Sequence, residues 1–115
     1  MHFTIVVPTR DRADTLEHTL RTCIAQDYDD LEILVSDNAS TDNTRDVVAS
    51  SSDRRIRYIN TGRRLSMTSS FEFAYSHVKP GYVISIGDDD GFPEGAIRAA
   101  ARIANSTRTA APSSF

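Results

Sequence analysis

Residues 31–43, Leu-Glu-Ile-Leu-Val-Ser-Asp-Asn-Ala-Ser-Thr-Asp-Asn, join a short apolar run to a polar loop. The run from Leu31 to Val35 is typical of a strand that is covered on both faces of a parallel sheet. The polar residues from Ser36 to Asp42 supply turn and helix-cap residues, and Val47 and Val48 follow in a predicted helix. This stretch therefore predicts a strand, a polar loop and a helix.

The same succession recurs along the rest of the chain. Further strands are predicted at Phe3–Val7, which Pro8 ends, at Ile56–Ile59 near a sheet edge, and at Tyr82–Ile86. Alternating strands and helices indicate parallel strands joined by right-handed crossovers. The predicted fold class is α/β, with a layered sheet flanked by helices.

Apolar residues at helical spacing mark the helices between these strands. Asp14 and Glu17 form a predicted capping box at the start of the first one, Pro80-Gly81 stops the third, and Pro93 fits the first turn of the last. The residues expected on the buried faces are Leu16, Leu20, Cys23 and Ile24; Phe71, Ala74, Tyr75 and Val78; and Ile97, Ala100 and Ile103.

Composition limits the classes of protein that fit. A chain of 115 residues with 39% hydrophobic and 25% charged residues predicts one globular domain. The net charge of −3 argues against a nucleic acid partner. Cys23 is the only cysteine, which excludes an intrachain disulfide and a cysteine-based zinc site. No apolar run approaches the roughly 20 residues of a membrane span, and we expect a cytoplasmic protein.

Polar residues follow three of the predicted strands, where open α/β sheets bind their ligands. Thr9, Asp37 and Asn38 could hydrogen-bond a base or a ribose, although each is also a common turn former. Arginines near these strand ends could bind a diphosphate or simply lie at the surface. These arginines are Arg10, Arg12, Arg63 and Arg64.

The fourth strand is followed by three consecutive aspartates, Asp88, Asp89 and Asp90, between two glycines. Like charges this close raise one another's pKa, and a divalent cation removes the penalty. Hard oxygen ligands favour Mg²⁺, Mn²⁺ or Ca²⁺. The alternative is a solvated acidic loop.

This sequence lacks the motifs of several classes of nucleotide-binding protein. Neither common spacing of a glycine-rich phosphate loop occurs, which speaks against a Rossmann dehydrogenase and a Walker-type nucleotidase. A nucleotidyltransferase would carry a glycine-rich basic loop where Pro8-Thr9-Arg10 stands. A receiver domain would place its acidic pair after the first strand. A binding module without catalysis stays open.

Three segments together resemble the signature segments of family 2 glycosyltransferases: residues 5–12, 31–43 and 81–90. The resemblance spans residues 3 to about 104 and implies a GT-A fold, a Rossmann-like, mostly parallel sheet flanked by helices. It also implies transfer of a sugar from a nucleoside diphosphate donor, a UDP-sugar being favoured, usually with inversion and with Mn²⁺ or Mg²⁺.

The resemblance also assigns residues. It implies that Pro8 and Thr9 line the nucleoside pocket, that Asp37 contacts the base, and that Asp88 faces the ribose or diphosphate. Asp89 is then the principal metal ligand, and Asp90 is a further candidate for metal binding. The expected donor-binding residues also include Arg12, Asn38 and Arg64. Gly87 stands where the family often has an aspartate, which leaves the division of roles among the three aspartates open.

The family's acceptor-side half has no counterpart in these residues. We therefore expect residues 1–104 to be the amino-terminal, nucleotide-sugar-binding part and residues 105–115 a tail or linker toward that half. The general base is expected after residue 115, and no residue of this chain is predicted to serve as one. The chain is expected to bind donor and to turn over poorly, with an acceptor that the sequence does not name.

Overall fold

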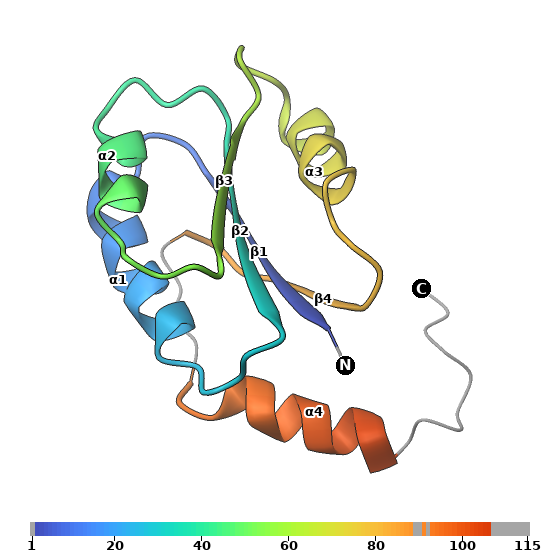
Figure 1. Ribbon diagram of the computed structural model, residues 1–115. Helices are drawn as coiled ribbons and strands as arrows, with labels where there is room; N and C mark the ends of the chain where they lie inside the picture. Colours follow the sequence, from blue (N-terminus) through green and yellow to red (C-terminus); the bar gives the residue numbers. More distant parts are fainter. Residues whose placement is uncertain (1, 89–90, 92, 107–115) are drawn as a thin grey trace.

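A computed structural model describes residues 2–88, 91 and 93–106, in which strands and helices alternate (Figure 1). The elements are β1 (Phe3–Thr9), α1 (Ala13–Ile24), β2 (Leu31–Asp37), α2 (Thr44–Ala49), β3 (Ile56–Asn60), α3 (Met67–Tyr75), β4 (Tyr82–Ser85) and α4 (Ala96–Ser106). The α/β class predicted from the sequence is confirmed.

The four strands form one parallel sheet in the order β3-β2-β1-β4. The register runs from Phe3 opposite Leu31 to Thr9 opposite Asp37. All carboxyl ends therefore meet at the same edge of the sheet. The predicted edge position of β3 is confirmed, and each of its residues is half-buried.

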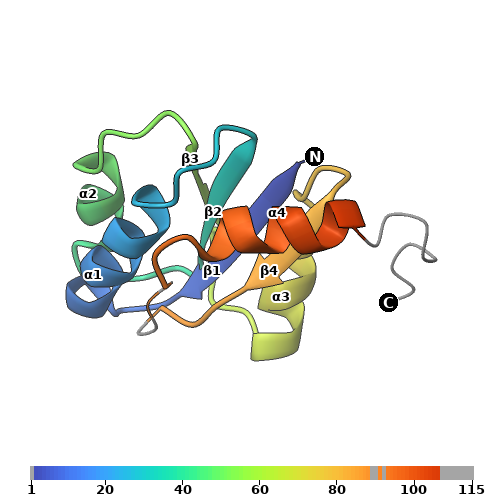
Figure 2. The same cartoon turned by 90° about the horizontal axis from the view of Figure 1, so that it is seen from below.

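Helices cover both faces of the sheet. In Figure 1, α1 and α2 lie on one side and α3 on the other. Alternate strand residues such as Ile5 and Ile33 pack with α1, α2 and α4, whereas Val6 and Leu34 pack against Ala74 of α3. Figure 2, seen from below, shows α4 passing in front of β1 and β4.

Pro8 does not end the first strand, because β1 continues to Thr9. The backbone N–H and carbonyl of Val6 point toward β4, since the Ile86 N–H donates to the Val6 carbonyl. The backbone nitrogen of Pro8, two residues further on, points to the same side. There β4 has already ended at Ser85. The missing N–H of proline therefore costs no ladder hydrogen bond.

The predicted capping box at Asp14 and Glu17 is also wrong. Helix α1 begins at Ala13, one residue earlier, and Asp14 lies in its first turn. The Ala13 N–H donates to Asp42 Oδ2 over 3.2 Å, so a carboxylate from the loop after β2 caps the helix. Glu17 instead lies 3.6 Å from Arg21, one helical turn later.

The last helix differs from its prediction at both ends. Pro93 precedes α4, where its carbonyl accepts from the Ala96 N–H, rather than lying in the first turn. Ile97 is fully buried and Ala100 packs against the core, but Ile103 is 64% exposed. The helix runs to Ser106, into the segment expected as a tail; residues 107–115 lie outside the described part.

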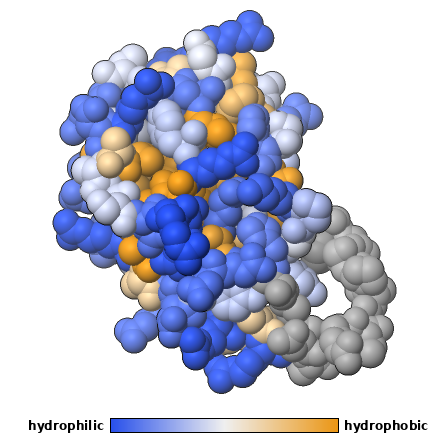
Figure 3. Space-filling model, viewed as in Figure 1, coloured by the Kyte–Doolittle hydropathy of each residue, from blue (hydrophilic) through white to orange (hydrophobic). Residues whose placement is uncertain are grey.

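The outer strand β4 has the most exposed apolar side chains of the sheet, with Tyr82 at 42% and Val83 at 41%. On the face seen in Figure 3, apolar side chains reach the surface in small areas surrounded by hydrophilic ones.

None of the helices in the described ranges has the length and apolarity to cross a membrane.

Replacement of Gly81 by Ala is expected to lower the free energy of unfolding by about 2 kcal/mol. Gly81 has a φ of +143°, and a Cβ there would lie 2.4 Å from the His2 carbonyl oxygen. That oxygen accepts from the Tyr82 N–H, so the clash falls where β4 begins to pair. Urea unfolding followed by circular dichroism measures the change.

Gly62→Ala is the matched control for this prediction. Gly62 also has a positive φ, +79°, but no atom lies within 4 Å of the added Cβ. It should cost only the conformational penalty, about 1 kcal/mol. Equal costs for the two variants would show that the contact with His2 is not what requires glycine at Gly81.

Candidate functional site

A cleft of about 310 Å³ opens at the carboxyl ends of the strands. Its walls come from the loops after β1, β2 and β4 and from the segment that begins α3. The lining residues are Pro8, Thr9, Arg10, Arg12, Asn38, Leu65, Met67, Ser70, Phe71 and Asp88.

The structure brings five of the predicted donor-binding residues to this cleft: Pro8, Thr9, Arg12, Asn38 and Asp88. Asp37 and Arg64 lie near it but do not line it. Asp89 and Asp90, the predicted metal ligands, fall outside the described residues.

Four lining residues were not among the candidates: Leu65, Met67, Ser70 and Phe71. Leu65 lies directly before the cap of α3, and the other three lie in the helix; Ser66 caps it by accepting from the Ser69 N–H over 3.2 Å. Ser70 and Phe71 lie in the first two turns after that cap. No signal in the sequence indicated that these residues face the cleft, which only the packing of α3 shows.

Asp88 is fixed at two atoms. Its Oδ2 accepts from Thr9 Oγ1 over 2.9 Å, and its backbone carbonyl accepts from Thr19 Oγ1 over 3.0 Å. Thr9 is 4% exposed and Thr19 is fully buried. The first aspartate of the acidic loop therefore has a set position relative to β1 and α1.

The carboxylate of Asp37 is held inside the protein. Asp37 is 1% exposed; its Oδ1 accepts from the Ser40 N–H over 2.9 Å, and its Oδ2 accepts from the Tyr58 hydroxyl over 2.6 Å. The Arg45 guanidinium lies 5.3 Å from the centre of the Tyr58 ring. This contact places a cation beside the Asp37–Tyr58 pair.

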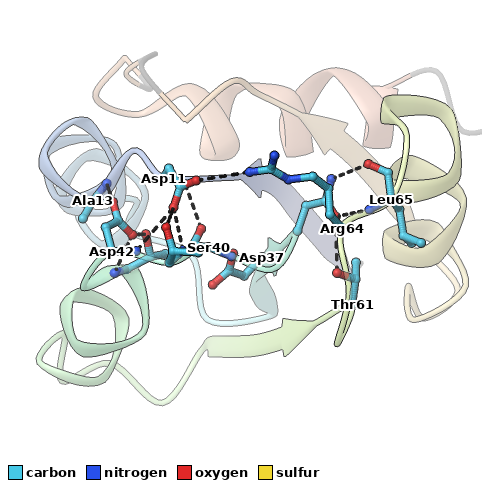
Figure 4. A network of polar contacts seen from close by, with 11 residues as sticks. Asp11, Ala13, Asp37, Ser40, Asp42, Thr61, Arg64 and Leu65 are labelled. Atoms are coloured by element: carbon cyan, nitrogen blue, oxygen red, sulfur yellow. Dashed lines mark hydrogen bonds and ion pairs between the residues drawn. The ribbon is translucent and has the colours of Figure 1, made fainter.

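A polar network beside the cleft joins the loops after β1, β2 and β3 (Figure 4). Asp11 Oδ1 accepts from the N–H groups of Thr41, over 2.6 Å, and Asp42, over 3.3 Å. The hydrogen bond from the Thr41 N–H is the main reason that the pKa of Asp11 lies below its usual value. Arg64 reaches Asp11 from the loop before α3 over 3.7 Å. This ion pair links Arg64 to the loops after β1 and β2.

The chemistry of the lining suits an anion held together with a cation. Arg10 and Arg12 supply positive charge beside the carboxylate of Asp88. Within the described residues no three His, Cys, Asp or Glu side chains gather into a metal site. One carboxylate still fits Mg²⁺ or Mn²⁺, because such an ion takes one or two protein carboxylates and completes its shell with phosphate oxygens and water.

Comparison with known proteins connects this geometry to a family. The sequence matches Glycosyl transferase family 2 over residues 4–113. A GalNAc(5)-diNAcBac-PP-undecaprenol beta-1,3-glucosyltransferase of Campylobacter jejuni is 32% identical over 104 residues, 88% of this chain and 34% of that protein. A validoxylamine A glucosyltransferase of Streptomyces hygroscopicus subsp. jinggangensis is 50% identical over 58 residues, 48% of this chain and 14% of that protein. The chain thus spans about a third or less of the length of these relatives.

Solved structures share the fold. The structure of S. aureus TarS 1-349 in complex with UDP-GlcNAc is similar with a TM-score of 0.85 and 19% identity, over 94% of this chain and 33% of that chain. The mannosyltransferase PcManGT of Pyrobaculum calidifontis, in complex with GDP-Man and Mn²⁺, is similar with a TM-score of 0.78 and 26% identity, over 96% of this chain and 33% of that chain. The GT-A fold expected from the sequence is confirmed.

Proposed function

The chain belongs to glycosyl transferase family 2, and from that premise we propose that its cleft binds the nucleoside diphosphate sugar of a metal-assisted, inverting sugar transfer. The observation that carries the proposal is the hydrogen bond from Thr9 to Asp88, which joins the carboxyl ends of β1 and β4 at the cleft. Ligands of open α/β sheets bind at such ends. Since the chain spans about a third or less of its relatives, donor binding is the share of the reaction that we assign to it.

The nucleoside part of the donor fits the polar end of the cleft. We assign Pro8 and Thr9, which line the cleft, to the nucleoside. The assignment of Asp37 to the base stays a prediction from the sequence, because this carboxylate is buried and binds Ser40 and Tyr58. A volume of about 310 Å³ lies at the lower end of the range for small-ligand sites. The volume of the cleft therefore fits a small ligand such as the nucleoside part of the donor.

The diphosphate requires positive charge, which arginines and a divalent metal supply. Arg12 lines the cleft, and Arg64 lies beside it with 58% of its side chain exposed. Asp88, Asp89 and Asp90 would hold Mn²⁺ or Mg²⁺, which offsets the charge that develops on the departing diphosphate. Asp88 would serve the ribose or diphosphate side of that site.

Uracil is the base that we favour, and guanine is the alternative. One structural neighbour is a complex with UDP-GlcNAc and another a complex with GDP-Man. The two bases differ in size and in their hydrogen-bonding edges. A direct comparison of UDP with GDP therefore decides the donor class.

Titration of UDP into the protein should give metal-dependent binding. We expect affinity in the presence of Mn²⁺ to exceed that in EDTA by at least about tenfold, because a metal bridges carboxylate and diphosphate. Isothermal calorimetry measures both conditions, with GDP in a parallel titration and circular dichroism to show that EDTA leaves the fold intact. Equal affinity with Mn²⁺ and with EDTA would contradict the metal-assisted site.

A further inference from the structure

The side-chain amide of Asn38 binds the backbone of Leu65 through both of its ends. Nδ2 donates to the Leu65 carbonyl over 2.9 Å, and Oδ1 accepts from the Leu65 N–H over 2.8 Å. Oδ1 also accepts from Thr61 Oγ1 over 3.3 Å. Asn38 is 7% exposed, so its amide is engaged mainly within the protein.

Leu65 precedes the part of α3 that forms one wall of the cleft. Ser66 follows it as the N-cap, and Ser70 and Phe71 line the cleft from the first turns of the helix. On the other side, the Asn38 N–H donates to the Thr9 carbonyl over 2.9 Å. Asn38 therefore connects two walls of the cleft, one formed by the carboxyl end of β1 and the other by the segment that begins α3.

We infer that Asn38 is a positioning residue, which sets the width of the cleft by holding Leu65 and the start of α3 against β1. The inference rests on the proposed function, since it concerns the same cleft. Asn38 also lines the cleft, and the role inferred here is the one it exerts through Leu65. Loss of the amide lets the loop of residues 61–66 move away from β2, and the donor then binds to a less well-ordered wall.

The first part of the test concerns the loop itself. Arg63 and Arg64 are exposed and lie directly before Leu65, so trypsin reports whether this loop opens. Asn38→Ala is expected to raise the rate of native-state cleavage after these two arginines by about tenfold or more. Asn38→Asp should behave alike, because a carboxylate oxygen would then face the Leu65 carbonyl without a donor.

Gln26→Ala is the matched control for loss of a buried amide. Gln26 is 2% exposed; its Nε2 donates to the carbonyls of Thr22 and Pro93, and its Oε1 accepts from the Ile97 N–H. It lies beyond the carboxyl end of α1, away from the cleft. This variant should be less stable overall, yet trypsin cleavage after Arg63 and Arg64 should stay at the wild-type rate.

The second part measures UDP affinity in Mn²⁺ by calorimetry. Asn38→Ala should bind about tenfold more weakly, and Gln26→Ala should bind as the wild type does. Weaker binding without faster cleavage would overturn the inference, because Asn38 would then contact the nucleotide directly. Unchanged cleavage in both Asn38 variants would overturn it as well. If the wild type binds neither UDP nor GDP, the proposed function fails, and the cleavage rates still decide whether Asn38 holds Leu65.

Discussion

Arg55→Met is expected to lower the free energy of unfolding by about 4 kcal/mol, as removal of one partner of a buried ion pair does. Arg55 and Asp53 have only 12% and 15% of their side chains exposed, and their closest atoms lie 2.8 Å apart. Arg55 Nε also donates to Asp53 Oδ1 over 3.0 Å, so the guanidinium binds both carboxylate oxygens. Methionine would leave the charge of Asp53 without this partner.

The same guanidinium binds three backbone carbonyls at the end of α1. It donates to Ile24 over 2.7 Å, to Gln26 over 2.8 Å and to Tyr28 over 2.9 Å. Carbonyls at a helix end have no partner within the helix, and a cation there also interacts favourably with the helix dipole. The loss therefore affects the connection between α1 and β2 as well as the loop before β3.

Urea unfolding of the Arg55 variants, followed by circular dichroism, measures this effect. Arg54→Met is the matched control, since Arg54 is the exposed neighbour and should change stability by less than about 0.5 kcal/mol. Arg55→Lys should recover less than half of the loss, because one ammonium cannot span the positions that a planar guanidinium reaches. A cost for Arg55→Met below about 1 kcal/mol would contradict the structural role that we assign to this residue.

The sequence predicted the positions of the strands better than their ends. Apolar runs such as Leu31–Val35 located the strands, because burial on both faces of a parallel sheet requires them. The end at Pro8 was wrong because the cost of a proline depends on whether a neighbouring strand faces its nitrogen. The cap at Asp14 was wrong because a carboxylate about 30 residues away, Asp42, took that place. Both outcomes depend on contacts between distant segments.

The candidate site, too, could be predicted only where local sequence signals decide the position of a residue. Residues at or shortly after the carboxyl end of a strand, such as Thr9 and Asp88, could be predicted to lie together, since parallel strands place their carboxyl ends at one edge. Leu65 and Phe71 could not, because nothing in the local pattern shows that α3 and the residue before its cap face the cleft. The partners of Asp37 and Asn38, namely Tyr58 and the Leu65 backbone, also lie outside any local motif.

Asp88→Asn is expected to weaken Mn²⁺-dependent UDP binding by about 100-fold, which corresponds to about 2.7 kcal/mol. The substitution keeps the size of the side chain, and the amide oxygen can still accept from Thr9 Oγ1. The position of the loop is therefore retained while the negative charge is lost. A charge that meets a divalent cation in a partly buried site contributes more than one at the open surface.

Calorimetry in Mn²⁺ and in EDTA measures the variant beside Glu94→Gln, which removes one negative charge from the exposed turn before α4. The control should bind UDP within about twofold of the wild type, because Glu94 does not line the cleft and an exposed charge is screened by water and salt. Asp89→Asn and Asp90→Asn extend the series to the two other candidate ligands, and the largest loss identifies the principal one. If Asp88→Asn still binds within twofold of the wild type in Mn²⁺, Asp88 is not part of the metal or diphosphate site, and its bond to Thr9 serves only to hold the loop.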